Sequence, residues 1–497
     1  MSKIGRNAVI ISLILLIVVI TWMQPHLNKM QEPFVEKRPQ ATHGGQFTNM
    51  LIDQSIQFFG AAALGLRQAV AGLLWIRTDE FFHRGEYETI IPLSRLVTWL
   101  DPQQIDVYST AAWHLDFNFV DSDQRSDKRL IPPAIKLMEE GIENNSDIYD
   151  LYFDLAWTHY YWKAKDYEKA LEWLKKAVQH DGRDPNTGRR IPRPGFVDRM
   201  LAHTYEKVGL LDESERQWRK NLADSIKRLK ANPKDGTRWQ EVGVCRRNLA
   251  MLCLRRAWRY GDMDAYKRGL DVLDELVRTE PNIAEKDPEQ VRAYKAAKKA
   301  YEQLAASGKR PHDVSPPIDV GFNVTWRKIK PKVIVIEGTL KLVPIEDYKG
   351  LAAEPYTNFW KSYEFLLPSK RPKWVDNSRV RIIFADADYN FREVKTPKKL
   401  SWEVDKTRTV LWDDTPVESG RFKIKIDMSR DPSFYPFAKE DYKLIVWFDP
   451  QEAPITVQDR IGWKGEGITD KNYLSTAFHP GYRVVVREFK LKRSDIM

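Results

Sequence analysis

Three alanines in the first half of the chain are each followed by a ring that could hold a ligand. These pairs are Ala112-Trp113, Ala156-Trp157 and Ala202-His203. Residues three positions apart share one face of a helix, so each ring should have a polar group beside it. The polar groups at that spacing are Asp116, Tyr160 and Glu206. Rigid rings with interleaved polar groups are typical of a wall that binds a peptide, so these six residues are candidates for a protein-binding groove.

The alternative is that the same rings only pack between neighbouring helices. Apolar residues recur around them at three- and four-residue spacing, which predicts helices. The clearest helix begins near Gly85 and places Ile90, Leu93 and Val97 on one face. Asp101-Pro102 should end it, because proline lacks the N–H group that a continuing helix needs.

Other motifs do not predict catalysis. The nine histidines are scattered, and the chain has no GxSxG elbow, phosphate-binding loop or dinucleotide fingerprint. The segment Asp386-Ala-Asp388-Tyr-Asn390 resembles the start of a calcium loop, but Phe391 replaces the required glycine and Pro397 the final glutamate. We therefore expect a strand-end turn there, and no enzyme activity, metal site or cofactor.

The composition limits the class of protein. With 497 residues, the chain should form two or three domains. Its net charge of +10 favours anionic partners, but lysine and arginine are spread along the chain without the dense basic run that tracks nucleic acid. No nucleic-acid partner is therefore expected. Cys245 and Cys253 are predicted to lie on one helix, about 12 Å apart along its axis, which is too far for a disulfide.

The N-terminus predicts a membrane anchor. Lys3 and Arg6 precede the apolar run of residues 8–23, and Trp22 suits a membrane interface. A cleaved signal peptide is the alternative, but no small-x-small cleavage site follows the run. Because a positive flank stays in the cytoplasm, residues 1–24 are predicted to be a single transmembrane anchor, with the bulk of the chain periplasmic or extracellular.

A second apolar stretch, residues 58–76, is also long enough to span a membrane. Arg67 and Gln68 lie at its centre, where a charge in lipid is costly. Its alanines and glycines suit close helix packing, so we predict that it forms the first packed helices of the soluble body. If it spans instead, everything after it returns to the cytoplasm. Residues 25–47, with three prolines and a Gly-Gly pair, are predicted to be a tether.

Helical segments with small and large residues in a similar order recur after residue 70. The recurring positions are Tyr108, Ala112 and Leu115; Tyr152, Leu155, Ala156, Ala170, Leu174 and Ala177; Leu201, Ala202, Tyr205, Gly209 and Trp218; and Gly261, Gly269, Leu273, Leu276 and Pro281. Taken in phase, they resemble the tetratricopeptide repeat (TPR), W-x2-L-G-x2-Y, then A-x3-F, then P. Tryptophan is missing from the first signature position in every unit. The resemblance covers residues 70–281.

The resemblance implies a solenoid of stacked helix pairs, in which the first helix of each pair lines a concave groove. It thereby implies a protein partner for Trp113, Trp157 and His203. A single helix pair cannot bury its apolar face alone, so at least three must stack. The segment 288–306, rich in lysine, glutamate and alanine, should form a polar cap. The predicted solenoid spans residues 48–306.

Residues 307–317, which contain a glycine and three prolines, are predicted to be a linker. Beyond them apolar residues alternate with polar ones, as in half-buried strands. The alternating residues are Val320, Phe322, Val324 and Trp326; Val333 and Val335; Leu340 and Leu342; Val380, Ile382 and Phe384; Phe422, Ile424 and Ile426; Leu444, Val446 and Phe448; and Val484, Val486 and Phe489. Six or more short strands predict an antiparallel β-sandwich over residues 318–497, making the chain a multidomain α and β protein.

These features lead to one preferred function and two alternatives. The preferred function is a membrane-tethered TPR scaffold that binds a protein partner on the extracytoplasmic side, in the assembly or organisation of an envelope complex. The first alternative is a carbohydrate- or envelope-polymer-binding protein that acts through the β-sandwich, which exposed tryptophans and tyrosines on one sheet face would favour. The second is an enzyme with an unrecognised site, but the sequence contains no paired acid and base residues that would support it.

Overall fold

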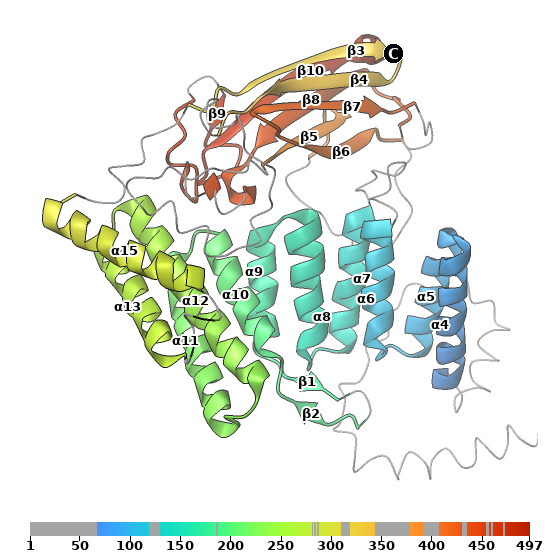
Figure 1. The fold of residues 1–497 in the computed structure, drawn as a ribbon. Helices are drawn as coiled ribbons and strands as arrows, with labels where there is room; N and C mark the ends of the chain where they lie inside the picture. Colours follow the sequence, from blue (N-terminus) through green and yellow to red (C-terminus); the bar gives the residue numbers. More distant parts are fainter. Residues whose placement is uncertain are drawn as a thin grey trace, which may run out of the picture. The chain divides into compact units, whose positions relative to one another are not determined.

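The structure is a computed structural model. It describes Asn282, Glu285 and residues 67–118, 130–184, 187–280, 288–309, 319–342, 378–390, 407–429, 435–453, 457–458, 461–470 and 473–497. The chain divides into two compact units, with the main boundary between Val197 and Asp198. In the described residues, helices are followed by antiparallel sheets (Figure 1), which confirms the predicted order of an α and a β region.

The first unit is built from helix pairs that follow one another along the chain. The pairs are α4 (Arg67–Arg84) with α5 (Tyr87–Leu100); α6 (Ile105–Trp113) and its continuation η2 (His114–Asn118) with α7 (Ile131–Asn144); and α8 (Tyr149–Asp154) and its continuation η4 (Leu155–Ala164) with α9 (Tyr167–Ala177). A short hairpin of β1 (Gly182–Arg183) and β2 (Arg190–Ile191) follows.

Local sequence explains where these helices begin, end and touch. Gly85 has a φ of 74°, a left-handed conformation that suits glycine in the turn before α5. Asp166 caps α9, since its Oδ1 accepts a hydrogen bond of 3.0 Å from the Lys169 N–H group. A side chain on Gly141 would start 2.7 Å from the ring of Tyr108, so glycine lets α6 and α7 approach.

The described part of the second apolar stretch lies in α4. Ala71 is buried against Val97 and Val107, and Arg67 donates a hydrogen bond of 2.6 Å to the Trp99 carbonyl. Packing therefore accommodates the charge at the centre of the stretch. No described helix is long and apolar enough to cross a membrane. The predicted anchor at residues 8–23 lies outside the described residues.

Besides the short α18 (Arg493–Ile496), the described residues of the second unit form five longer α-helices. They are α10 (Gly195–Lys207, whose first three residues belong to the first unit), α11 (Leu211–Ala231), α12 (Gly236–Tyr260), α13 (Met263–Thr279) and α15 (Pro288–Ser307). The side chain of Asp235 caps α12 and that of Asp262 caps α13. Cys245 and Cys253 are buried and unbridged on α12, as predicted. The predicted cap helix at residues 288–306 is α15.

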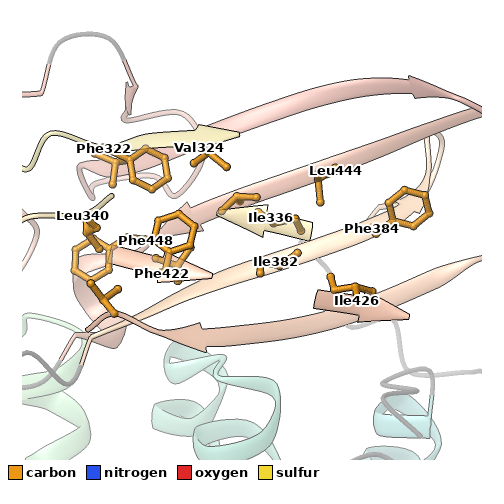
Figure 2. Close-up of a cluster of buried hydrophobic side chains, with 14 of the residues drawn as sticks. Phe322, Val324, Ile336, Leu340, Ile382, Phe384, Phe422, Ile426, Leu444 and Phe448 are labelled. Carbon is orange, nitrogen blue, oxygen red and sulfur yellow. The ribbon is translucent and has the colours of Figure 1, made fainter. Parts of the chain in front are cut away.

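The same unit contains two antiparallel sheets. One has the strand order β3 (Asn323–Lys330), β4 (Val333–Thr339), β7 (Arg421–Asp427). The other has the order β6 (Val410–Pro416), β5 (Arg379–Asp386), β8 (Asp441–Phe448), β10 (Val484–Lys492), β9 (Leu474–Ser475). Figure 2 shows the core that both sheets share, with Ile336 and Phe422 from the first sheet and Ile382 and Phe448 from the second. The sheets therefore form a sandwich.

A loop of the C-terminal region contributes to the helical core of this unit. Trp463 is 1% exposed and belongs to the same hydrophobic cluster as Ala202, Trp218 and Cys245. Its ring stacks on Tyr260 at a centroid distance of 6.0 Å. The division into a solenoid (48–306) and a sandwich (318–497) as separate folding units stays a prediction, for which Trp463 offers a test.

Candidate functional site

Two segments of the first unit are π-helices, and both carry predicted site residues. They are η2 (His114–Asn118) and η4 (Leu155–Ala164), each of which continues an ordinary α-helix. A π-helix bonds residue i to i+5 and is found mostly as short segments, frequently at functional sites. The two segments pack against each other, and they organise an outer set of aromatic rings and an inner charged pair.

The aromatic set consists of Trp113, Phe117, Trp157, Tyr161 and Trp162. Trp113 stacks on Phe117 at a centroid distance of 6.0 Å, and Trp157 stacks on Tyr161 at 4.5 Å. Trp162 meets Trp157 edge to face at 5.6 Å. Trp113 is 39% exposed and Trp162 is 57% exposed, which is unusual for tryptophan. Such partly exposed rings can anchor apolar side chains of a partner.

The inner side of the two π-helices holds a charged pair. His159 Nδ1 lies 2.6 Å from Asp116 Oδ2, and both side chains are completely buried. Lys163 places its ammonium 4.2 Å from the ring centroid of Phe117, which links η4 to η2 a second time. These contacts fix the two helices that display the aromatic set.

Burial and charge shift the pKa values of this pair. Burial raises the pKa of the Asp116 carboxyl above its ordinary value, although the charge of His159 opposes the shift. Burial alone would lower the pKa of His159, but the charge of Asp116 and the hydrogen bond to it raise that pKa. Asp116 Oδ1 and His159 Nε2 have no hydrogen-bond partner among the described residues.

The predicted groove residues of the first unit separate into exposed and buried ones. Trp113 is exposed and Trp157 is half-buried, whereas Asp116 and Tyr160 are buried. The predicted spacing assumed an α-helix, but Asp116 lies in η2 and Tyr160 in η4. The wider π-helical turn moves residue i+3 around the axis, so it no longer shares a face with residue i. The polar groups therefore point inward, and Asp116 pairs with His159.

The other two predicted residues, His203 and Glu206, lie on α10 in the second unit. The ring of His203 meets Trp218 edge to face at 4.8 Å, and burial lowers its pKa. Glu206 is buried and accepts a hydrogen bond of 2.9 Å from Arg255 on α12. Both contacts hold helices together. Whether any of the six predicted residues binds a partner stays a prediction.

Sequence reasoning missed Phe117, Tyr161, Trp162 and His159. The run Trp157-Thr-His-Tyr-Tyr-Trp162 holds four aromatic side chains and a histidine in six residues, a density that could have indicated a special segment. It also missed a pair in the sandwich, where His479 Nδ1 lies 2.6 Å from Asp449 Oδ2 and its ring stacks on Tyr482. The described residues contain no group of three or more His, Cys, Asp or Glu side chains placed to hold a metal ion.

Comparisons with known proteins give only partial likenesses. No protein-family model and no curated protein matches this chain. It is similar to the MamA protein, at 13% identity and a TM-score of 0.24, over 44% of this chain and 97% of that one. It is also similar to a thermophilic TPR protein of Thermus thermophilus, at 16% identity and a TM-score of 0.25, over 39% of this chain and 92% of that one. A third similar structure is PilF of Pseudomonas aeruginosa, at 14% identity and a TM-score of 0.27, over 48% of this chain and 99% of that one.

Proposed function

We propose that this protein is a scaffold that binds a protein partner through the aromatic set of its first unit. The observation that carries the proposal is the exposure of Trp113 and Trp162 on helices whose inner side is fixed by a buried charged pair. Large rings held on a rigid support lose little conformational freedom on binding, so they contribute strongly to affinity. The partner should present apolar side chains that fit between these rings.

We propose further that residues 8–23 anchor the scaffold in a membrane, with the N-terminus cytoplasmic and the bulk of the chain extracytoplasmic, where it organises an envelope complex. Lys3 and Arg6 before the apolar run support this orientation. The exposed face of α4 supports closeness to a membrane surface, since Leu73 and Ile76 are each 69% exposed at three-residue spacing.

The aromatic set is tested by a double variant, Trp113→Ala with Trp162→Ala. We expect it to weaken binding by about 2 kcal/mol or more, roughly 30-fold in Kd, because exposed tryptophans act as binding hot spots. Unfolding should change little, since neither ring is buried. The measurement is affinity capture from detergent extracts, identification of the captured protein, and titration of that protein against each variant.

Trp239→Ala is the matched control, because Trp239 is also exposed but lies on α12 in the second unit. Its loss should leave capture unchanged. Equal loss of capture in the control and the double variant would reject the aromatic set, as would a loss that only follows unfolding.

The membrane proposal is tested by topology mapping. In right-side-out vesicles from a single-membrane preparation, added protease should digest the large C-terminal part, and in inverted vesicles it should not. Deletion of residues 1–40 should release the chain from the membrane. Protection in right-side-out vesicles would contradict the orientation. Retention of the truncated chain on membranes in high salt would contradict an anchor confined to residues 8–23.

A further inference from the structure

The β-sandwich contains a groove with a mixed polar and apolar lining, which lies apart from the aromatic set along the chain. It has a volume of about 570 Å³ and is lined by the three-stranded sheet near the start of β7 and by Thr415 and Pro416 at the end of β6. Its lining includes the hydroxyls of Thr325 and Thr339, the carboxylates of Glu337 and Glu418, and the cations of Arg421 and Lys423. Donors, acceptors and both signs of charge therefore meet in one groove.

Strand pairing places the lining residues of β3, β4 and β7 on the outer face of the sheet, and Glu418 lies in the turn before β7. Three cross-strand rows face outward, because the residues between them, such as Ile336 and Phe422, belong to the sandwich core. The outward rows are Asn323, Thr339 and Arg421; Thr325, Glu337 and Lys423; and Arg327 and Lys425 on either side of the buried Val335. The face therefore extends the groove with two further cations.

The charge of this face is strongly unbalanced. Arg421, Lys423 and Lys425 stand at alternate positions of β7, so they form a column with steps of about 7 Å. Only Lys423 has an ionic partner within the described chain, the half-exposed Glu337 at 3.2 Å. Arg327, Arg421 and Lys425 make no ion pair with any described residue, and all three are exposed. Unpaired cations in a column favour a linear anionic ligand.

The carboxylates in the groove narrow the class of ligand. Glu337 and Glu418 would repel a polymer that offers only anionic groups, but they accept hydrogen bonds from hydroxyl groups. The hydroxyls of Thr325 and Thr339 donate to the carbonyls of Glu337 (3.3 Å) and Gly321 (2.7 Å), so they can accept hydrogen bonds from hydroxyl groups of a ligand. A ligand with many hydroxyls and regularly spaced acidic groups satisfies the whole lining. An acidic peptide satisfies it less well, because it offers carboxylates to the cations but few hydroxyl groups to Glu337, Glu418 and the threonines.

We propose that the outer face of the β3–β4–β7 sheet binds an acidic polysaccharide. Arg421, Lys423 and Lys425 hold its acidic groups, while Glu337 and the threonine hydroxyls hold its sugar hydroxyls. This activity goes beyond the protein-binding scaffold and rests on a different part of the chain, so either proposal can fail without the other.

The experiment uses the full chain in detergent and titrates polygalacturonate, a polymer of uronic acids, with dextran as the neutral polymer. Wild type should bind polygalacturonate and not dextran, and added salt should weaken the binding. The variant Arg421→Gln with Lys423→Gln and Lys425→Gln should lose at least tenfold in affinity. The pair Thr325→Val with Thr339→Val, which keeps every charge, should lose several-fold.

A matched control removes three exposed lysines from α11, by Lys220→Gln, Lys227→Gln and Lys230→Gln. It lowers the net charge equally and should keep affinity within about twofold. Equal loss in this control would mean that only net charge matters, which overturns the proposal. Unchanged polygalacturonate binding by the Thr325→Val, Thr339→Val variant would also overturn it. So would binding of polyglutamate, or of anionic phospholipid vesicles, that the β7 variant weakens as strongly as it weakens binding of polygalacturonate.

One more outcome concerns the edge position of β7. Cations on an edge strand also prevent edge-to-edge association of sheets. If wild type binds no polygalacturonate and light scattering shows that the β7 variant aggregates, the cations of β7 serve to prevent aggregation and the proposal is wrong. Retained polymer binding in the Trp113→Ala, Trp162→Ala variant would show that the two surfaces act independently, as the proposal expects.

Discussion

Replacing Asp116 with alanine should lower the free energy of unfolding of the first unit by about 3–5 kcal/mol, because it leaves the buried ring of His159 without its hydrogen-bond and ionic partner. The pair is fully buried, and its 2.6 Å contact joins residues 43 positions apart. Loss of one buried partner costs far more than loss of one exposed partner, since water cannot solvate the remaining charge. Urea unfolding followed by circular dichroism measures the effect.

Glu172→Ala is the control for this prediction. Glu172 accepts a hydrogen bond of 2.8 Å from Lys176 on the exposed side of α9, so the contact is similar in length but solvated. Its removal should cost less than about 1 kcal/mol. If the two single variants destabilise the unit equally, burial of the Asp116–His159 pair does not increase its contribution to the free energy of unfolding.

The same pair should make stability depend on pH, and the sign follows from the pKa shifts. The pKa of His159 is raised above 6.5 and that of Asp116 above 3.8, so the native state holds more protons than the unfolded state between the ordinary and raised values. The stabilisation that His159 contributes is therefore complete below its ordinary pKa and is lost as pH rises through the raised one, whereas burial makes the ionisation of Asp116 cost stability as pH rises through its own raised pKa.

The double variant Asp116→Asn with His159→Gln removes this titration and leaves Asp154 and Lys163 in place. The difference in free energy of unfolding between wild type and this variant should shrink as pH rises above 6.5, the ordinary pKa of histidine, and through the raised pKa of His159. A difference that stays constant or grows with pH would contradict a raised pKa of His159 in the folded state.

Much of the fold could be predicted because it depends on local sequence. The end of α5 at Leu100 follows from Asp101-Pro102, and the start of α15 follows from Pro288. In β5, β7 and β8 the alternation of apolar residues predicted both the strand and the face that enters the core. These signals are contained within a few residues, so no tertiary information is needed to use them.

Some strand details depend on pairing and were not predictable. On β10 the predicted residues Val484 and Val486 do not belong to the core between the sheets, which takes Val485 instead. A shift of one residue reverses the faces of a strand, and a run of three valines leaves that choice open. β6 was missed because its Asp-Asp pair interrupts the apolar alternation.

The candidate site was only partly predictable for a related reason. The positions of Trp113 and Trp157 follow from the repeat spacing, but π-helical turns have no sequence period that distinguishes them over one or two turns. His159 and Asp116 meet only because two helix pairs stack, and nothing local to either residue indicates the other. The aromatic set and its buried support are therefore properties of the tertiary structure.

Replacing Trp463 with alanine should destabilise the second unit by about 3–5 kcal/mol, because it empties a packed position in the helical core. The ring belongs to a cluster otherwise made of residues from α10, α12, α13 and neighbouring helices. It also stacks on Tyr260, whose hydroxyl donates a hydrogen bond of 3.0 Å to Glu466. Gly462 and Gly465, with φ values of 88° and 76°, permit the tight turn that presents the ring.

Limited proteolysis at the predicted linker, residues 307–317, separates the contribution of this ring from that of the covalent connection. In wild type, the helical and sandwich fragments should stay together in gel filtration after the cut, because Trp463 remains in the helical core. In Trp463→Ala they should elute separately. Trp239→Ala, which removes an exposed ring from α12, should behave as wild type. If the wild-type fragments part as soon as the linker is cut, residues 48–306 and 318–497 fold and act as independent domains, and Trp463 contributes little to holding them together.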